Sequence, residues 1–437
     1  MPSEAPARPR RRLSGLIVAE PHEVPAVFGG FALFFLLFAS YFMLRPVRET
    51  FGIVGGVDNL QWMFTGTFVA TLLVVPVYGW VASRMPRRRL LPILYSFSAL
   101  VMAGFATSLL TDPQNVWIAR AFYIWLSVMN LFVISVAWSL MADLFEPEQG
   151  HRLFGQIAAG ASLGGLAGPL LSGFLVAPLG EAGLLYLSSF LLVATLLCVR
   201  YLLSWHDRHC RPSPVPRREK IGGSIWEGIS LIARSPYLLA ISAFVLMLTT
   251  ASTFLYFEQA RIVEATFPDR TAQTQVFASI DATVQSLTIL IQVFLTGRIA
   301  KRLGVTALLV AVPATMMFGF GLLALAATFP ILAFVMIVRR VGEYALVRPG
   351  REMLFTPVPV ETKYKAKNAI DTFVYRGGDA IAGWTYAGIV AVATTGAVAL
   401  AGAALAGLWA CIGYAVGRRH DGNADRPTTP AARQATA

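Results

Sequence analysis

The stretch GWVASRMPRRR (79–89) returns in shortened form as GRIAKRLG (297–304). In each copy a glycine is followed five residues later by an arginine, Arg84 and Arg302, and each copy comes directly after a long apolar run. The two copies are separated by about half of the 437-residue chain. This spacing predicts that the chain consists of two repeats of one membrane unit, in parallel orientation.

The composition indicates that most of the chain lies in a membrane. Hydrophobic residues make up 56% of the sequence and charged residues 14%, and the mean hydropathy is +0.62; a soluble domain carries about 25% charged residues. A membrane-spanning helix needs about 20 predominantly apolar residues. Twelve such windows are present, at roughly 27–51, 61–82, 91–110, 116–141, 153–177, 184–204, 236–257, 274–299, 305–327, 331–354, 368–392 and 396–416.

The predicted fold class is therefore an all-α membrane protein with twelve transmembrane helices in two parallel six-helix repeats. A segment rich in proline and glycine separates the repeats, and a short surface helix is expected within it, around residues 225–233. The expected organisation is a cytoplasmic N-tail (1–26), an N-terminal six-helix bundle (27–204), a cytoplasmic linker (205–235), a C-terminal six-helix bundle (236–416) and a disordered cytoplasmic C-tail (417–437).

The distribution of lysine and arginine predicts the orientation, because cytoplasmic loops are enriched in both. If the N-terminus lies inside, most of the 36 Lys and Arg residues fall in inner loops and tails, and the outer loops hold only Arg261 and Arg270. We therefore expect a multi-pass protein of the bacterial inner membrane with both termini in the cytoplasm. The same bias accounts for the formal net charge of +12, so nucleic acid is not an expected partner.

Sequence signatures of soluble enzymes are absent. The chain has no G-x-x-x-x-G-K-[ST] phosphate loop, no H-E-x-x-H site and no C-x-x-C pair. We expect a monomer without enzymatic activity, cofactor or metal, whose partners are a small-molecule substrate, membrane lipid and, in one alternative, a proton. The glycines between 160 and 168 lie four apart within an apolar window, a spacing that favours close helix packing; a ligand-facing backbone is the alternative.

Charged residues inside the apolar windows are the candidates for function, because an ionised side chain in the bilayer is costly unless it faces a cavity or a partner. Arg45 and Arg48 are three residues apart and share a helix face. Their guanidinium groups can bind carboxylate or phosphate oxygens through paired donors. The alternative is that both reach the outer headgroups. Arg120, in the fourth window, is a further candidate for substrate binding.

The window 331–354 holds the largest group of charges. Helical spacing places Arg340, Glu343 and Arg351 on one face. Glu343 is expected to neutralise Arg340 or its neighbour Arg339, which leaves Arg348 or Arg351 for an anionic substrate. A structural ladder of ion pairs is the alternative.

Four residues are candidates for coupling: Asp281, Asp371, Arg376 and Asp379. Arg376 and Asp379 are three residues apart and are expected to pair, which leaves Asp281 and Asp371 as lone acids. A carboxyl group withdrawn from water retains its proton more readily and can exchange it near neutral pH, so either lone acid could couple transport to protons. Hydrogen bonding to neighbouring helices is the structural alternative.

The two basic stretches resemble the G-x-x-x-D-R-x-G-R-R loop motif of the major facilitator superfamily, although Ser83 and Lys301 replace its aspartate. The resemblance implies that Gly79, Arg84, Gly297 and Arg302 belong to gating loops. Further motifs resemble the ATP/ADP translocase (nucleotide transporter) branch of plastids and intracellular bacteria and its free-living bacterial relatives. They are LRPVRE (44–49), AD (142–143), HRLFG (151–155), RPGREMLF (348–355) and KYKAKNAID (363–371).

This second resemblance implies a twelve-helix fold and a cavity whose basic residues bind phosphates. The family's nucleotide exchangers carry a lysine where the second helix begins, whereas this chain reads NLQWM (59–63). The expected function is therefore secondary active transport of a small organic anion by alternating access. Nucleotide (NTP/NDP) exchange, proton-driven efflux, a siderophore-type permease and a non-transporting membrane module are the alternatives.

Overall fold

The computed structural model describes residues 19–209, 225–393 and 395–424, and every regular element in these ranges is helical. The first half of the chain, here called the N-half, contains α1 (Val24–Val54), α2 (Leu60–Arg84), α3 (Arg87–Thr111), α4 (Val116–Leu144) and α5 (Pro147–His209). The second half, the C-half, contains α6 (Ile225–Arg234), α7 (Pro236–Thr266), α8 (Arg270–Ile291), α9 (Gly297–Leu325), α10 (Phe329–Gly342), α11 (Arg348–Leu354), α12 (Val360–Ala369), α13 (Tyr375–Val392) and α14 (Thr395–Ala424).

Eight helical segments of the described chain are long and apolar enough to cross a membrane. They include the 62-residue segment Glu148–His209 and the 56-residue segment Arg270–Leu325, each more than twice the length of about 20 residues that one crossing requires. Both contain a non-helical glycine: Gly180 has φ 67° and Gly304 has φ 75°. Side chains other than glycine rarely adopt these angles, so the sequence places a chain reversal in each segment.

Three π-helical segments interrupt the C-half, at Gln292–Thr296, Glu343–Val347 and Ile370–Val374. Each joins two α-helices end to end: α8 to α9, α10 to α11, and α12 to α13. A π-helical turn contains an extra residue and rotates the residues that follow it relative to those before it. The second and third segments carry charged residues that the sequence analysis singled out.

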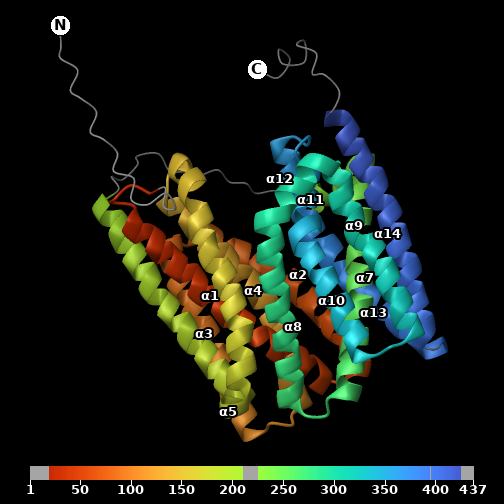
Figure 1. The fold of residues 1–437 in the computed structure, drawn as a ribbon. Helices are drawn as coiled ribbons and strands as arrows, with labels where there is room; N and C mark the ends of the chain where they lie inside the picture. The colour runs from red at the N-terminus through yellow and green to blue at the C-terminus, as the bar shows by residue number, and fades with distance from the viewer. Residues whose placement is uncertain (1–18, 210–224, 394, 425–437) are drawn as a thin grey trace, which may run out of the picture.

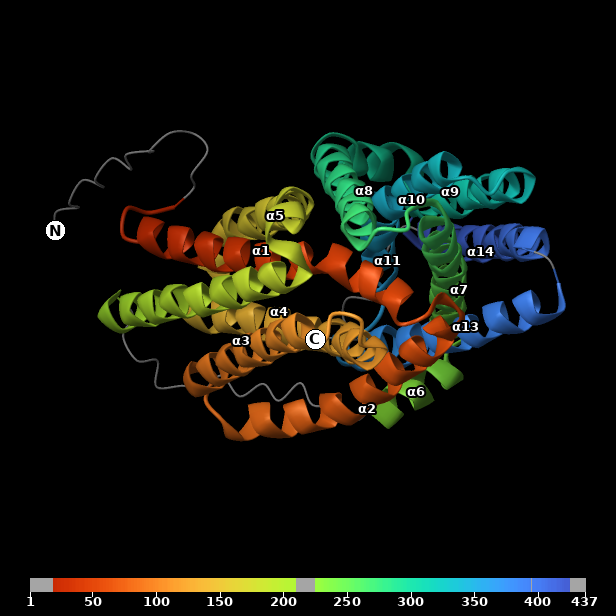
Figure 2. The same ribbon diagram turned by 90° about the horizontal axis from the view of Figure 1, so that it is seen from below.

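Each half has its own hydrophobic core. One cluster of buried residues is formed by α1, α3, α4 and α5, and another mainly by α7, α9, α10 and α14. The second cluster also includes Ile53, Val57 and Leu60 of the N-half, because the two halves meet there. Figure 2 shows the halves as two groups of helices, which contact each other mainly through α5 with α8, α1 with α8 and α2 with α13.

The most extensive packing within the N-half is between α1 and α5, and it confirms the close approach expected from the glycine spacing. A Cβ atom at Gly160 would lie 2.2 Å from the carbonyl oxygen of Phe31, and one at Gly164 would lie 2.3 Å from that of Phe35. Only the absence of a side chain allows the two backbones to come this close. These glycines therefore hold α5 against α1.

Several contacts between the halves lie at the end of the molecule opposite the start of α1 and the end of α14 (Figure 1). Arg261 donates to Asp58 at 3.1 Å, and Arg270 donates to the carbonyl of Pro113 at 2.6 Å and to Gln114 at 2.8 Å. Helix ends nearer the chain ends bond within their own half; Arg88 pairs with Asp207, for example. The halves are therefore joined at one end and diverge toward the other.

The helix ends differ from the predicted boundaries in three places, one of which is the start of α1 at Val24, within the predicted N-tail. α14 continues to Ala424, beyond the predicted bundle end at 416, so the first residues of the predicted C-tail are helical. Asp421 accepts hydrogen bonds from the backbone N–H groups of Val305 and Thr306, at 3.1 Å each. α5 likewise continues to His209. The predicted linker helix is observed as α6, which packs on α12; residues 210–224 lie outside the described chain.

Glu23, directly before α1, connects the start of α1 to α5 through hydrogen bonds. Its buried carboxylate accepts hydrogen bonds from Gln149 at 2.9 Å and Arg152 at 2.8 Å, and from the backbone of Glu20. Burial opposes ionisation, but these donors outweigh it and lower the pKa of Glu23. Glu20, His22 and Glu23 place possible metal-ligand atoms within 4.8 Å of one another, but the carboxylate of Glu23 is already used by these three donors.

Candidate functional site

A central cavity of about 470 Å³ lies between the two halves. Its wall is formed by α1, α2 and α4 of the N-half and by α7, α10, α11, α13 and the π-helical segments Glu343–Val347 and Ile370–Val374 of the C-half. Six arginines and three acids line it: Arg45, Arg48, Arg339, Arg348, Arg351, Arg376, Glu343, Asp371 and Asp379. The wall therefore carries an excess of positive charge.

Arg45 and Arg48 lie in the cavity wall, as their placement on one face of α1 predicted. Arg48 donates to Glu49 at 2.6 Å, and its guanidinium lies 5.3 Å from the centroid of the Tyr123 ring. Arg45 is held more loosely, with its Nε 3.7 Å from Asp281 and 4.0 Å from Glu49. Arg45 therefore lacks a close carboxylate partner of its own.

The C-half arginines differ from the predicted pattern at one position. Arg339, not Arg340, lines the cavity, where it donates to Glu343 at 2.9 Å and to Ser252 at 2.7 Å. The prediction that Arg340, Glu343 and Arg351 share a face assumed a regular α-helix. The π-helical segment Glu343–Val347 changes the register, so that Arg340 turns toward α8 and is 4% exposed.

The expectation that Asp281 is a lone acid is wrong. Asp281 is 2% exposed and pairs closely with Arg340, while its other oxygen lies 3.7 Å from Arg45. Asp281 and Arg340 belong to the C-half and Arg45 to the N-half. The three charges therefore form a buried link between the halves.

The expectation that Asp371 is a lone acid is also wrong, because Asp371 pairs with Arg351 at 3.2 Å. Arg376 and Asp379 do pair as expected, although loosely, at 4.0 Å. Asp379 also accepts a hydrogen bond of 3.3 Å from Thr253 of α7. Sequence spacing could not reveal Arg351 as the partner of Asp371, because Arg351 lies in α11 and Asp371 in the π-helical segment Ile370–Val374.

Arg120 lies outside the residues that line the cavity. Its Nε donates to the carbonyl of Gly55 at 2.8 Å, and its guanidinium lies 4.9 Å from the centroid of the Trp117 ring. This arginine fastens α4 to the end of α1. We therefore remove it from the candidate substrate contacts.

The residues expected in gating loops lie in helices. Gly79 and Arg84 belong to the last turns of α2, and Arg84 stacks on Trp80 with 4.2 Å between the guanidinium and the ring centroid. Gly297 begins α9 and Arg302 follows within it, before the break at Gly304. The chain reverses within the first basic stretch, at Met85 and Pro86 between α2 and α3, and at Gly304, the last residue of the second.

Tyrosines of the cavity wall are the main residues that the sequence analysis missed. None of the five was among the candidate site residues. Each lies within about one helical turn of an intramembrane charge, which is the signal that could have identified them. The cavity tyrosines are Tyr41, Tyr123, Tyr256, Tyr344 and Tyr375.

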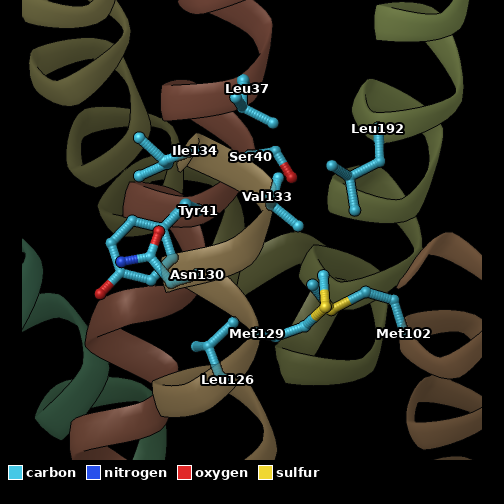
Figure 3. Close-up of a pocket in the computed structure, with 10 residues that line it drawn as sticks. All are labelled: Leu37, Ser40, Tyr41, Met102, Leu126, Met129, Asn130, Val133, Ile134 and Leu192. Carbon is cyan, nitrogen blue, oxygen red and sulfur yellow. The ribbon is translucent and has the colours of Figure 1, made fainter. Parts of the chain in front are cut away.

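A small apolar pocket adjoins the cavity in the N-half (Figure 3). Leu37, Met129 and Leu192 are among its lining residues, and Tyr41 and Asn130 line both this pocket and the cavity. Its free volume, about 20 Å³, is enough for about one water molecule. No charged residue lines it, so the central cavity is the site that suits a charged solute.

Comparisons with known proteins agree with this arrangement. The chain is 21% identical over 427 residues to "ADP,ATP carrier protein 1" of Chlamydia muridarum (strain MoPn / Nigg), covering 82% of this chain and 80% of that protein. It is 22% identical over 183 residues to "Multidrug resistance protein 3" of Bacillus subtilis (strain 168), covering 41% of this chain and 33% of that protein.

Solved structures show the same fold. A bacterial homologue of the iron transporter ferroportin in an inward-facing state has a TM-score of 0.65 and 13% identity, with 91% of this chain and 98% of that chain covered. The nucleoside transporter NupG has a TM-score of 0.62 and 13% identity, with coverage of 91% and 99%. Residues 26–350 match the Major Facilitator Superfamily. Because this match covers most of the sequence, the chain belongs to that superfamily and is a secondary transporter.

Proposed function

We propose that this protein carries a small organic anion across the membrane by alternating access. The observation that carries the proposal is the cavity between the halves, in which six arginines face three acids. Uncompensated charge is costly inside a membrane, and an anion in the cavity would offset it. Planar guanidinium groups also suit carboxylate and phosphate oxygens.

We further propose twelve membrane crossings, with both termini in the cytoplasm of a bacterial cell. The breaks at Gly180 and Gly304 support counting each of the two longest segments as two crossings. Two more crossings would come from the charged stretches 329–354 and 360–392. In each of them a π-helical turn joins two α-helices. The bundle boundaries predicted from the sequence, 27–204 and 236–416, fit this count. The cavity would then open to the cytoplasm.

Cysteine labelling tests this topology. Thr111 lies at the closed end of the molecule and Ser83 at the end where the halves diverge, and both are exposed. In a background without native cysteines, Thr111→Cys should react with an impermeant maleimide on intact cells, and Ser83→Cys should react only after the membrane is opened. The reverse pattern would contradict a cytoplasmic location of the termini.

Arg45, which lines the cavity and has no carboxylate closer than 3.7 Å, provides the test of anion transport. Arg45→Ala removes a charge-assisted contact worth about 1.5–3 kcal/mol, so the apparent KM for a transported anion should rise at least tenfold. Uptake of labelled mono-, di- and tricarboxylates, phosphate esters and nucleotides into proteoliposomes measures it. Arg208→Ala, an exposed change at the end of α5, is the matched control. Unchanged KM in Arg45→Ala would remove this arginine from the substrate path.

Asp379 is the acid that we propose for proton coupling. Asp281 and Asp371 have closer arginine partners, whereas Asp379 has Arg376 at 4.0 Å and a hydroxyl donor, Thr253. Asp379→Asn should abolish uptake driven by a pH gradient and spare counterflow between labelled and unlabelled substrate. Uptake that depends only on preloaded substrate, and that ignores both pH and this substitution, would favour obligate exchange instead.

Nucleotide exchange is the second candidate, supported by the similarity to a protein named as an ADP,ATP carrier. In the same vesicles it predicts that external ATP enters only when ADP is inside. Efflux of amphipathic compounds is a third alternative, for which the partial similarity to a multidrug resistance protein is the only support among these comparisons.

A further inference from the structure

The charges around the cavity do not balance. Seven arginines form one cluster with five acids: Arg45, Arg48, Arg339, Arg340, Arg348, Arg351 and Arg376, with Glu49, Asp281, Glu343, Asp371 and Asp379. With the carboxyl groups ionised and the tyrosine hydroxyls neutral, the cluster carries two excess positive charges. Their location can be deduced from the distances.

Each acid has one nearest arginine. The five nearest pairs are Arg48 with Glu49 at 2.6 Å, Arg339 with Glu343 at 2.9 Å, Arg340 with Asp281, Arg351 with Asp371 at 3.2 Å, and Arg376 with Asp379 at 4.0 Å. Arg45 and Arg348 remain. Their shortest distances to a carboxylate, 3.7 Å in both cases, lead to Asp281 and Glu343, which already have closer partners.

The two remaining arginines meet at one side chain. Arg45 of α1 donates to the hydroxyl of Tyr344 at 3.3 Å. Arg348 of α11 lies over the ring of the same tyrosine, 4.5 Å from its centroid. Both arginines and Tyr344 line the cavity. One unneutralised arginine from each half therefore contacts Tyr344, Arg45 at the hydroxyl and Arg348 at the ring.

We propose that the substrate is a compact dianion whose two negative charges are bound by Arg45 and Arg348, with Tyr344 between them. This inference rests on the proposed anion transport and narrows its substrate class. A dianion neutralises the cluster, a monoanion leaves one positive charge, and a nucleotide triphosphate adds more negative charge than the cluster lacks. Because the two arginines belong to different halves, a dianion would also bridge the halves across the cavity.

Dicarboxylates and phosphate monoesters share this chemistry, and a matched series separates them. The purified full-length protein is titrated with butyrate, succinate, glycerol 3-phosphate, citrate and ADP, and binding is followed by calorimetry and by the shift in thermal unfolding. At least one of succinate and glycerol 3-phosphate should bind at least tenfold more tightly than butyrate, citrate and ADP. The stronger of the two identifies the charged group.

Arg348→Gln tests the role of this arginine directly. The side chain is 57% exposed, so its loss should not prevent folding. The variant should lose at least tenfold in dianion affinity and no more than twofold in butyrate affinity. Arg348→Lys should recover most of the dianion preference, and the surface variant Arg208→Gln should behave as wild type.

The outcomes separate this inference from the proposed function. If butyrate binds the wild-type protein as tightly as both succinate and glycerol 3-phosphate, or if Arg348→Gln weakens the binding of all anions equally, the dianion proposal is overturned while anion transport stands. If ADP binds more tightly than both succinate and glycerol 3-phosphate, the dianion proposal is overturned and a nucleotide substrate is favoured. Absence of both binding and uptake for every anion overturns the proposed function itself.

Discussion

Asp281→Asn should lower the free energy of unfolding by about 3–5 kcal/mol, the cost of removing one partner from a buried ion pair. The substitution would leave Arg340, which is 4% exposed, without its close carboxylate, and would also remove the acid that lies 3.7 Å from Arg45 of the other half. We expect transport to be lost as well, because Arg340 of the C-half and Arg45 of the N-half then both lose the carboxylate that links the halves.

Thermal and denaturant unfolding of the detergent-solubilised protein measures the effect. Asp207→Asn is the matched control, since Asp207 pairs with Arg88 at the exposed end of the N-half, where an ion pair is worth about 0–1 kcal/mol. The double variant Asp281→Asn/Arg340→Met should recover part of the lost stability, because it removes the unpaired charge. An unfolding temperature for Asp281→Asn equal to that of Asp207→Asn would show that the buried pair is not required.

The behaviour of Asp281 illustrates which parts of the site the sequence could predict. Hydropathy windows and basic loops identify a helical membrane protein, because lipid demands long apolar segments. Intramembrane charges were likewise recognisable one by one, and Arg45, Arg48, Arg348 and Arg351 do line the cavity. Pairs within one stretch of helix were predictable, as Arg339 with Glu343 and Arg376 with Asp379 show. The partners of Asp281 and Asp371 were not, because they come from other helices and sequence spacing reports only neighbours on the same helix.

The π-helical segments account for the remaining error in the site. The prediction placed Arg340 in the cavity by counting regular α-helical turns through residues 340–351. The extra residue in the turn at Glu343–Val347 exchanges the roles of Arg339 and Arg340. Nothing in the local composition marks this change, which depends on packing against α8 and α9. The same segment carries Tyr344, so the residue that joins Arg45 to Arg348 was missed for the same reason.

Gly164→Ala should prevent normal packing of the N-half. A Cβ atom there would lie 2.3 Å from the carbonyl oxygen of Phe35 and 3.0 Å from the backbone nitrogen of Ala39. Because both are backbone atoms of α1, no side-chain rotation relieves the clash, and α1 and α5 must move apart. Overpacking usually costs about 1–3 kcal/mol; we expect the upper end or more, since α1 and α5 form the largest helix contact of the described chain.

Gly155→Ala is the control that makes this prediction specific. Gly155 lies on the same helix, α5, and an added Cβ meets nothing within 4 Å. Both substitutions gain about 1 kcal/mol of helix propensity, so the difference between the variants reports the helix contact alone. Gly155→Ala should elute from size-exclusion chromatography as wild type and unfold at the same or a higher temperature, whereas Gly164→Ala should aggregate or unfold at a clearly lower one. If the two variants behave alike, α1 and α5 are not in backbone contact at Gly164, and the arginines that α1 presents to the cavity are not positioned by this packing.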